Sequence, residues 1–335
     1  MEIGKIQANE LEEKILDKIK YHHRDVLLHA GIGEDSAVVD FGEEVLVISS
    51  DPITGATDNA GYIAVHITCN DLAAAGAKPV GLQVVLLLPD SIKDNQISNL
   101  MQEIHDTAAE IDVEILGGHT EIVSTVSQPI IVTTGIGKAK KESYLPTGGA
   151  RVGDDLVVTK GLGIEGIYIL ANDYQKYLLA QGISFDLIKS AQQFGSKLSV
   201  LPEGEIAVET GAHALHDITE GGLYGALEEM SKASNKGFEI SLETLELSPE
   251  IKVITEVLGL DPAGLLSSGS MLIATPKGEK LVKKLDNNGI KAWQIGNVRD
   301  KEKYIGDSKG NLYDFNWSGE DELWKWMNIM EETSS

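Results

Sequence analysis

Apolar residues recur at helical spacing in many parts of the chain. The most strongly apolar helix is predicted over 62–79, with Asn59 capping its start and Gly76 and Pro79 at its end. An amphipathic helix is predicted over 97–111, and further helices near 9–19, after the glycine run 161–166, and near 185–193, 204–211, 223–230, 249–258, 277–288 and 317–330. We expect the last of these, with Leu323, Trp326 and Met330 on one face, to pack on the body of the protein.

Short apolar runs bounded by turn residues predict strands between these helices. We expect strands at 37–39, 45–50, 82–88, 113–116, 129–137, 155–159, 238–242, 270–275 and 292–295. The run 82–88 is apolar apart from Gln83, which predicts a strand covered on both faces. Because strands and helices interleave in both halves, we expect two α/β or α+β domains, over 1–145 and 150–335, with a linker at 138–153.

Two polar residues interrupt the apolar helix. Asn70 and Asp71 stand side by side among small and apolar residues. A buried carboxylate without a partner costs several kcal/mol, so Asp71 requires a cation, a strong donor or a wet cleft. A bound cation and a structural carboxylate satisfied by neighbouring backbone amides are equally consistent with this helix alone.

Composition and charge narrow the classes of partner. The chain has 335 residues, with 42% hydrophobic and 24% charged residues, as in ordinary globular proteins. A net charge of −24 without a Lys/Arg cluster argues against nucleic acid as a partner. With a single cysteine, Cys69, and no apolar run long enough for a signal peptide or membrane span, we expect a soluble cytoplasmic protein.

Three acidic residues of the amino-terminal half fall where α/β proteins build sites. Asp35 and Asp51 lie at the ends of predicted strands, and Asp71 lies in the apolar helix. If two of these carboxylates meet, either a proton or a cation must compensate their repulsion. Oxygen ligands favour Mg²⁺, which binds substrate phosphates, and the glycine pairs at 31–33 and 117–118 allow backbone N–H groups to approach a phosphate. The alternative for each glycine pair is an ordinary turn.

The sequence supports neither of two common nucleotide-binding motifs. The run from Gly161 to Gly166 fits G-x-G-x-x-G, but the acidic residue expected about 20 positions later falls in a helical stretch instead of at a strand end. No P-loop motif occurs. Cys69, in the apolar helix, is expected to be a core residue.

Six short motifs together resemble one superfamily. They are G-x-G-E-D-S-A-V at 31–38, S-S-D ending at 51, N-D-L-A-A-A-G-A-K-P at 70–79, G-G-H-T at 117–120, H-D-I-T-E-G-G at 216–222 and S-S-G-S-M-L-I-A at 267–274. In this order they resemble the ATP-dependent superfamily of aminoimidazole ribonucleotide synthetase (PurM), HypE, thiamine-monophosphate kinase (ThiL) and selenophosphate synthetase (SelD). The resemblance implies a two-domain PurM-like protein, with an amino-terminal α/β domain that forms a homodimer and a carboxyl-terminal α+β domain.

The resemblance also implies ATP with Mg²⁺ and transfer of the γ-phosphoryl group to a small or partner-borne substrate. Carried over by motif, the metal positions are Asp35, Asp51 and Asp71, and the catalytic positions are Asp71, Asp217 and His119. The cofactor-binding positions are Gly33, Asn70, Gly117, Gly118, Thr120, Gly221 and Gly222.

The motifs look most like the HypE type, an enzyme of hydrogenase maturation, with three departures. One is that His119 stands at a position that is acidic in several branches of the superfamily. The chain ends without the cysteine that accepts the carbamoyl group in that family, and Glu220 stands where arginine is usual. A reversed charge near the substrate indicates a different or cationic substrate. The alternatives are a ThiL-like small-molecule kinase and a non-catalytic ATP-binding scaffold dimer.

Overall fold

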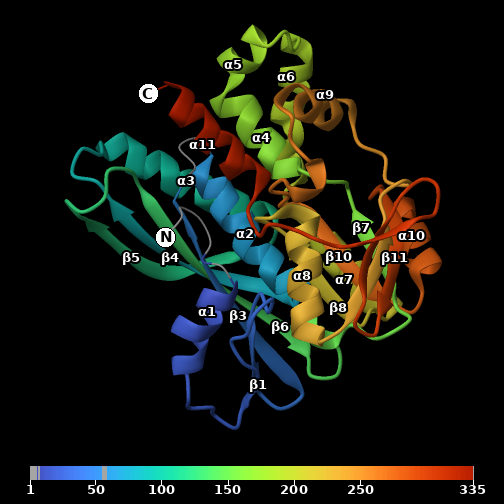
Figure 1. Cartoon of the computed structure of the whole chain (residues 1–335). Helices are drawn as coiled ribbons and strands as arrows, with labels where there is room; N and C mark the ends of the chain where they lie inside the picture. Colours follow the sequence, from blue (N-terminus) through green and yellow to red (C-terminus); the bar gives the residue numbers. More distant parts are fainter. Residues whose placement is uncertain (1–5, 7, 55–58, 335) are drawn as a thin grey trace. The chain divides into compact units, whose positions relative to one another are not determined.

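The computed structural model describes residue 6 and residues 8–54 and 59–334. The chain divides into two compact units, and the division does not follow the order of the sequence. The smaller unit holds His22–His29 and Asp35–Tyr144, whereas the larger unit holds the residues up to Tyr21, Ala30–Glu34 and the chain from Leu145 onward. Strands and helices alternate in both units, which confirms the α/β (α+β) class (Figure 1).

The smaller unit contains a six-stranded sheet with the order β1-β2-β3-β6-β4-β5. Neighbouring strands are antiparallel except for the parallel pair β4–β5. The strands are β1 (Val26–Leu28), β2 (Ala37–Asp40), β3 (Glu44–Ile53), β4 (Lys78–Leu88), β5 (Glu114–Ile122) and β6 (Ile130–Lys140). Two helices, α2 (Ala60–Ala74) and α3 (Asp94–Glu110), lie along this sheet (Figure 1).

The apolar helix is shorter at its carboxyl end than the sequence pattern predicts. Helix α2 ends at Ala74 because Gly76 takes a left-handed conformation (φ of +71°) and the Ala77 N–H donates to the Leu72 carbonyl at 2.9 Å. This is the hydrogen bond of a Schellman cap. Pro79 therefore lies in β4. Asn59 holds the expected cap position, but its side chain makes no capping hydrogen bond.

Two strand predictions in this unit are wrong in a way that matters for the site. Within 82–88, Gln83 is exposed and Val85 and Leu87 are half-buried, so this part of strand β4 is not covered on both faces. The sequence pattern predicts a strand over 113–116 that stops before the run Gly117–Glu121. This run forms the body of β5 instead, because pairing with β4 continues from Gly81–Glu114 to Leu88–Ile122.

The larger unit contains a seven-stranded sheet with the order β13-β12-β9-β11-β7-β10-β8. Its pairs are antiparallel except for β12–β9. The strands are β7 (Asp155–Thr159), β8 (Ala214–Ile218), β9 (Gly237–Ser241), β10 (Ser270–Thr275), β11 (Ala292–Arg299), β12 (Lys303–Gly306) and β13 (Leu312–Asp314). The sequence pattern did not predict β8, β12 or β13.

Helices complete the larger unit. They are α1 (Ala8–Lys14), α4 (Ile164–Asp173), α5 (Gln175–Ala180), α6 (Phe185–Ala191), α7 (Leu201–Thr210), α8 (Gly222–Ser234), α9 (Pro249–Leu258), α10 (Gly278–Asn287) and α11 (Glu322–Ser334). Short 3₁₀ turns occur at η1 (Leu16–Lys18), η2 (Thr147–Gly149), η3 (Gln192–Lys197) and η4 (Pro262–Gly264). The core under α8 is formed by Leu223, Leu227 and Met230 with strand residues such as Leu156, Leu272 and Ile295.

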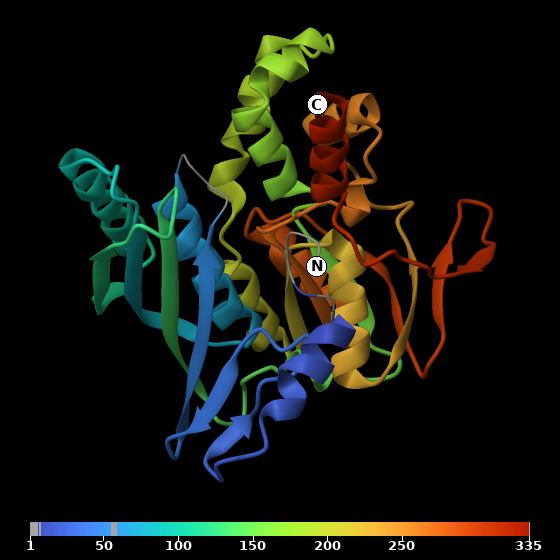
Figure 2. The ribbon, with the colours of Figure 1, turned by 60° about the vertical axis from the view of Figure 1, so that its left-hand side comes forward.

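Helix α11 packs on the unit as predicted. Trp326 makes edge-to-face contacts with Tyr174 and Tyr177, at centroid distances of 4.9 and 5.5 Å, and Leu323 is fully buried. Figure 2 shows the helix lying beside α4 and α9. Among the helices that the structure describes, none combines the length and the apolar character that a bilayer crossing requires.

Candidate functional site

Asp51 and Asp71 meet at one serine in the smaller unit. The Ser49 hydroxyl donates to the Asp71 carboxylate, and Asp51 Oδ2 lies 3.4 Å from the same hydroxyl. Ser49 and Asp71 are buried, at 8% and 7% exposure, whereas Asp51 is partly exposed. Two of the three predicted metal ligands are therefore neighbours, although they are 20 residues apart in sequence and belong to different elements.

Strand geometry explains why these residues meet. Side chains two apart on a strand share a face, so Ser49 and Asp51 continue the face that Val45 and Val47 bury. Helix α2 packs along β3 and β6, and Thr68 of the helix is hydrogen-bonded to Thr133 of β6, the residue that pairs with Asp51. One helical turn further, Asp71 faces Ser49.

Asp35 lies two residues before β2 begins at Ala37, and Ala37 pairs with Ile48 in the antiparallel β2–β3 ladder. The meeting of Asp35 with Asp51 and Asp71 stays a prediction. Asn70, next to Asp71 on α2, is fully buried.

The donor set fits a divalent cation with oxygen ligands. Two carboxylates that share one hydroxyl repel each other by about 4 kcal/mol if their oxygens lie ~4 Å apart at an effective dielectric of 20. A hard cation removes that repulsion, and carboxylate oxygens are the ligands that Mg²⁺ prefers. Asp51 and Asp71 therefore offer the oxygen ligands that such an ion requires, and the metal role of these two residues and of Asp35 stays a prediction.

The predicted phosphate-binding residues at 117–120 lie in β5, an edge strand of the sheet. Glycine is required at 117 and at 118 for different structural reasons. A Cβ on Gly118 would lie 1.7 Å from the Val84 carbonyl oxygen, so only glycine lets β5 approach β4 there. A Cβ on Gly117 would meet nothing within 4 Å, and only its φ of +143° favours glycine. Gly118 is explained by strand packing, while packing does not explain Gly117.

His119 and Thr120 lie on the same strand. The His119 side chain is 65% exposed, with Nε2 3.5 Å from the Glu121 carboxylate, and Thr120 pairs with Leu86 of β4. In the order β3-β6-β4-β5, three strand spacings of about 14 Å in total separate β5 from β3. The β5 residues thus form a group apart from the Asp51–Asp71 pair.

In the larger unit, Asp217 lies on β8 beside a histidine that the sequence analysis did not select. His216 and Asp217 are both 2% exposed and pair with Leu272 and Met271 of β10. His216 Nε2 lies 2.8 Å from the Glu229 carboxylate on α8. A histidine held by a carboxylate has a fixed ring orientation, and the spacing of 13 residues gives no sign of it in the sequence.

Gly221 and Gly222 form the start of α8, and the chain's own carboxyl-terminal segment covers Gly221. The Gly221 N–H donates to Asp321 Oδ2 at 2.6 Å, and the Trp317 ring lies 2.7 Å from where a Cβ of Gly221 would stand. A Cβ on Gly222 would lie 2.6 Å from the Ala263 carbonyl oxygen. Close packing accounts for glycine at both positions, and the binding role predicted for them stays a prediction.

Three acidic residues gather near this helix start. Burial raises the pKa of Glu165, on the first turn of α4, to about 7, and the charges of Asp321 and Glu220 contribute. Burial also raises the pKa of Asp321 to about 6, against hydrogen bonds from Leu323, Gly221 and Leu266. A hydrogen bond from Ser268 partly opposes the shift at Glu165. The sequence analysis missed both residues, because neither lies in a motif of its own.

Gly33 and Glu34 are packed within the larger unit. A Cβ on Gly33 would lie 2.6 Å from the Glu229 carbonyl oxygen, which explains the glycine at a φ of +77°. The Glu34 carboxylate accepts the N–H groups of Thr147 and Gly148 at 3.1 and 3.0 Å. This contact anchors the loop at the first turn of η2.

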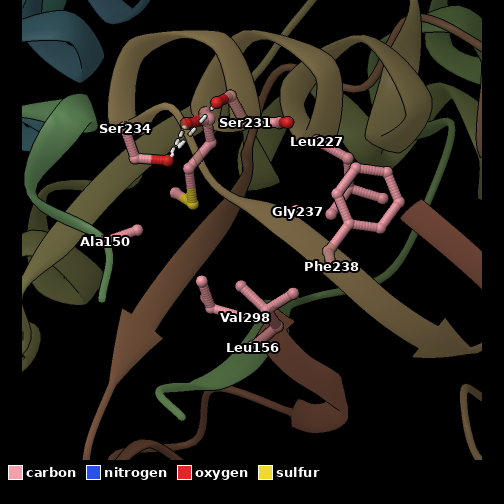
Figure 3. Close-up of a pocket in the computed structure, with 9 residues that line it drawn as sticks. Ala150, Leu156, Leu227, Ser231, Ser234, Gly237, Phe238 and Val298 are labelled. Carbon is pink, nitrogen blue, oxygen red and sulfur yellow. Dashed lines mark hydrogen bonds between the residues drawn. The ribbon is translucent and has the colours of Figure 1, made fainter. Parts of the chain in front are cut away.

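A cavity under α8 is too small for a substrate. Its volume is about 10 Å³, and Leu156, Leu227, Phe238 and Val298 line it together with Ser231 and Ser234 (Figure 3). The hydroxyls of Ser231 and Ser234 donate to backbone carbonyls of Lys236 and Met230, so neither needs a ligand. A volume of this size holds at most one water molecule.

Two family models match most of the chain. The amino-terminal domain of the AIR synthase-related proteins matches residues 33–139, and their carboxyl-terminal domain matches residues 151–308. The chain belongs to the AIR synthase-related family. The superfamily indicated by the six motifs is thereby confirmed, together with its two-domain architecture.

Curated relatives of this family member include proteins of the HypE type. A putative hydrogenase expression/formation protein of Methanocaldococcus jannaschii is 32% identical over 279 residues, which is 80% of each chain. A carbamoyl dehydratase HypE of Bradyrhizobium diazoefficiens is 27% identical over 72% of this chain and 69% of its own. A selenide, water dikinase of Methanococcus maripaludis is 28% identical over 88% and 92%.

Solved structures show the same fold. A chain of a HypE–HypF complex superimposes with a TM-score of 0.75 at 22% identity, covering 92% of this chain and 99% of that one. HypE in complex with ATP gives a TM-score of 0.70 at 22% identity, covering 94% and 93%. At 22% identity, the similarity to these structures shows a shared fold and nothing further.

Proposed function

We propose that the protein is a Mg²⁺-dependent, ATP-binding enzyme of HypE-like type. It transfers the γ-phosphoryl group of ATP to a small or partner-borne substrate, or dehydrates that substrate. The observation that carries this proposal is the meeting of Asp51 and Asp71 at Ser49, an arrangement suited to a divalent ion. The HypE-type relatives, and the solved structure of HypE in complex with ATP, support the nucleotide and a role in hydrogenase maturation.

In this proposal each group of residues has a distinct task. Asp51 and Asp71, with Asp35, would hold Mg²⁺, which would supply positive charge against the phosphate oxygens. Asn70 adds an amide beside Asp71, and the β5 residues Gly117 and Thr120 offer a backbone and a hydroxyl to phosphate oxygens.

Asp217 and His119 are proposed to act on the substrate, and Gly33, Gly118, Gly221 and Gly222 shape the backbone around the nucleotide. A carboxylate and an imidazole are both able to accept a proton from an attacking group. His119 is accessible for this on β5, and Asp217 is held on β8 next to the His216–Glu229 pair. The domain limits 1–145 and 150–335 remain part of the proposal.

The Cys69 thiol is a poor candidate for a covalent acceptor. It is the single thiol in these 335 residues and is fully buried on α2. Burial raises its pKa to about 12, which suppresses the thiolate that nucleophilic chemistry requires. We therefore propose that the acceptor is a separate molecule.

The open face of the six-stranded sheet supports a homodimer. Alternate residues of β4 face away from the buried side and leave Val80, Val85 and Leu87 partly or largely exposed. A second copy of the chain would cover these apolar residues. We propose a homodimer formed through this sheet, without a nucleic-acid or membrane partner.

ADP release and nucleotide binding test the proposal. The wild-type protein should release ADP from ATP only with Mg²⁺ and an acceptor, tried with a carbamoylated thiol, selenide and thiamine monophosphate in parallel. Asp71→Asn should abolish release by removing a ligand charge, and Asp90→Asn, at an exposed position after β4, is the matched control. ATP binding without turnover on any acceptor would favour a scaffold, and turnover with thiamine monophosphate would favour a ThiL-like kinase.

A further inference from the structure

We infer that Ser49 is a positioning residue, which sets where the carboxylates of Asp51 and Asp71 lie and thereby how strongly they bind a divalent ion. This inference rests on the proposed function, because it assumes that the two acids are metal ligands. The sequence motifs assign no role to Ser49. The residue is singled out by its contacts with both carboxylates.

Ser49 departs from the apolar pattern of its strand face. Val45 and Val47 precede it on the buried face of β3, at 1% and 0% exposure, and a third valine would complete the pattern. Burying a hydroxyl is unfavourable unless it is hydrogen-bonded. Here the hydroxyl donates to Asp71, so the cost of burying it is met by a charged acceptor.

The hydroxyl is placed to serve both carboxylates. It has one proton, which it donates to Asp71 in this arrangement, while Asp51 lies 3.4 Å away as a second acceptor. Rotation about χ1 changes the acceptor without moving the backbone. Ser49 therefore keeps two like charges close together, and this proximity is what a shared cation requires.

The next residue supplies a matched control. Ser50 is exposed on the opposite face of β3, and its hydroxyl contacts Thr134 Oγ1 of β6 at 2.9 Å. The substitution Ser50→Ala thus removes the same hydroxyl from the same strand without touching either carboxylate. Ser49→Thr keeps a hydroxyl at the buried position on a side chain that suits a strand.

The test measures Mn²⁺ binding directly, with MnCl₂ alone and with a non-hydrolysable ATP analogue, by the electron paramagnetic resonance signal of free Mn²⁺. Ser49→Ala should raise the Kd for Mn²⁺ about tenfold, the size expected for a lost hydrogen bond to a charged group. Ser50→Ala should leave it within about twofold, and Ser49→Thr should restore most of the affinity. Circular dichroism of each variant confirms that it is folded.

Four outcomes of the Mn²⁺-binding test would overturn the positioning role of Ser49. Unchanged Mn²⁺ affinity in folded Ser49→Ala, or equal weakening in Ser49→Ala and Ser50→Ala, overturns the positioning role and leaves the proposed function intact. Failure of Ser49→Thr to restore binding also overturns it. A wild-type protein that binds no Mn²⁺ under either condition refutes the metal in the proposed function, and the positioning role falls with it.

Discussion

The carboxylate of Asp321 joins the starts of two helices. Its Oδ2 accepts the Gly221 N–H at 2.6 Å, before α8, and its Oδ1 accepts the Leu323 N–H at 2.8 Å, in the first turn of α11. The first N–H groups of a helix lack partners within the helix, and a carboxylate there satisfies them and interacts favourably with the helix dipole. This contact holds the carboxyl-terminal helix against the segment that carries Gly221.

Removing this carboxylate should destabilise the protein. We expect Asp321→Ala to lower the free energy of unfolding by about 2 kcal/mol, because the N–H groups of Gly221, Leu323 and Leu266 lose their acceptor. Asp321→Asn should cost less, since its amide oxygen still accepts one hydrogen bond. Urea unfolding of the full chain measures both variants against Asp286→Ala, at an exposed position on α10. Equal midpoints for the two alanine variants would contradict the capping role.

Glu165 should make stability depend on pH. Its pKa is raised from 4.5 to about 7 in the folded protein, so the folded state holds a proton that the unfolded state loses between these values. Stability is fully present below about pH 4.5 and falls as the pH rises through about 7, by on the order of 3 kcal/mol. The raised pKa of Asp321 also makes stability fall as the pH rises, over the lower range from 3.8 to about 6.

Glutamine at position 165 tests this dependence. Because Glu165→Gln resembles the protonated acid, the variant should be more stable than wild type at pH 8.5 and close to it at pH 5, as measured by urea midpoints. Glu279→Gln changes an exposed glutamate in the first turn of α10 and should leave the pH profile unchanged. A profile for Glu165→Gln parallel to that of wild type would show that Glu165 does not titrate in this range.

The two neighbouring glycines of β5 should respond differently to alanine. Gly118→Ala places a Cβ against the Val84 carbonyl oxygen and should destabilise the protein by about 3 kcal/mol, because β5 must move away from β4. Gly117→Ala meets open space and should cost only about 1 kcal/mol of backbone strain. Thermal unfolding of both variants checks the difference. If the effects are equal, the close approach of β5 to β4 is not what requires glycine at 118.

Cys69 should resist modification in the folded protein. Its thiol is fully buried and its pKa is raised to about 12, so both access and thiolate are lacking. Iodoacetamide should leave the native protein unlabelled and label one thiol after denaturation, as counted by mass spectrometry. Rapid labelling of the native protein would mean that α2 opens readily.

Much of the architecture follows from local patterns in the sequence. The periodicity over 97–111 predicts α3, and the apolar runs at 155–159 and 270–275 predict β7 and β10, because these segments bury a face whose spacing is visible in the sequence. The predicted strand at 113–116 is too short, because residues 117–121 carry a Gly-Gly pair and polar side chains that are not typical of a strand. Pairing with β4 overrides that local preference.

The sequence by itself determined the family, through six short motifs in a fixed order, and the chemistry of the candidate site, through acidic residues placed at strand ends and in an apolar helix. Only the tertiary structure decided that Asp51 and Asp71 meet at Ser49, that His216 pairs with Glu229, and that Asp321 reaches Gly221. Three of these contacts, Ser49–Asp71, His216–Glu229 and Gly221–Asp321, join residues 22, 13 and 100 positions apart. Strand register and helix packing bring them together, and neither leaves a local trace in the sequence.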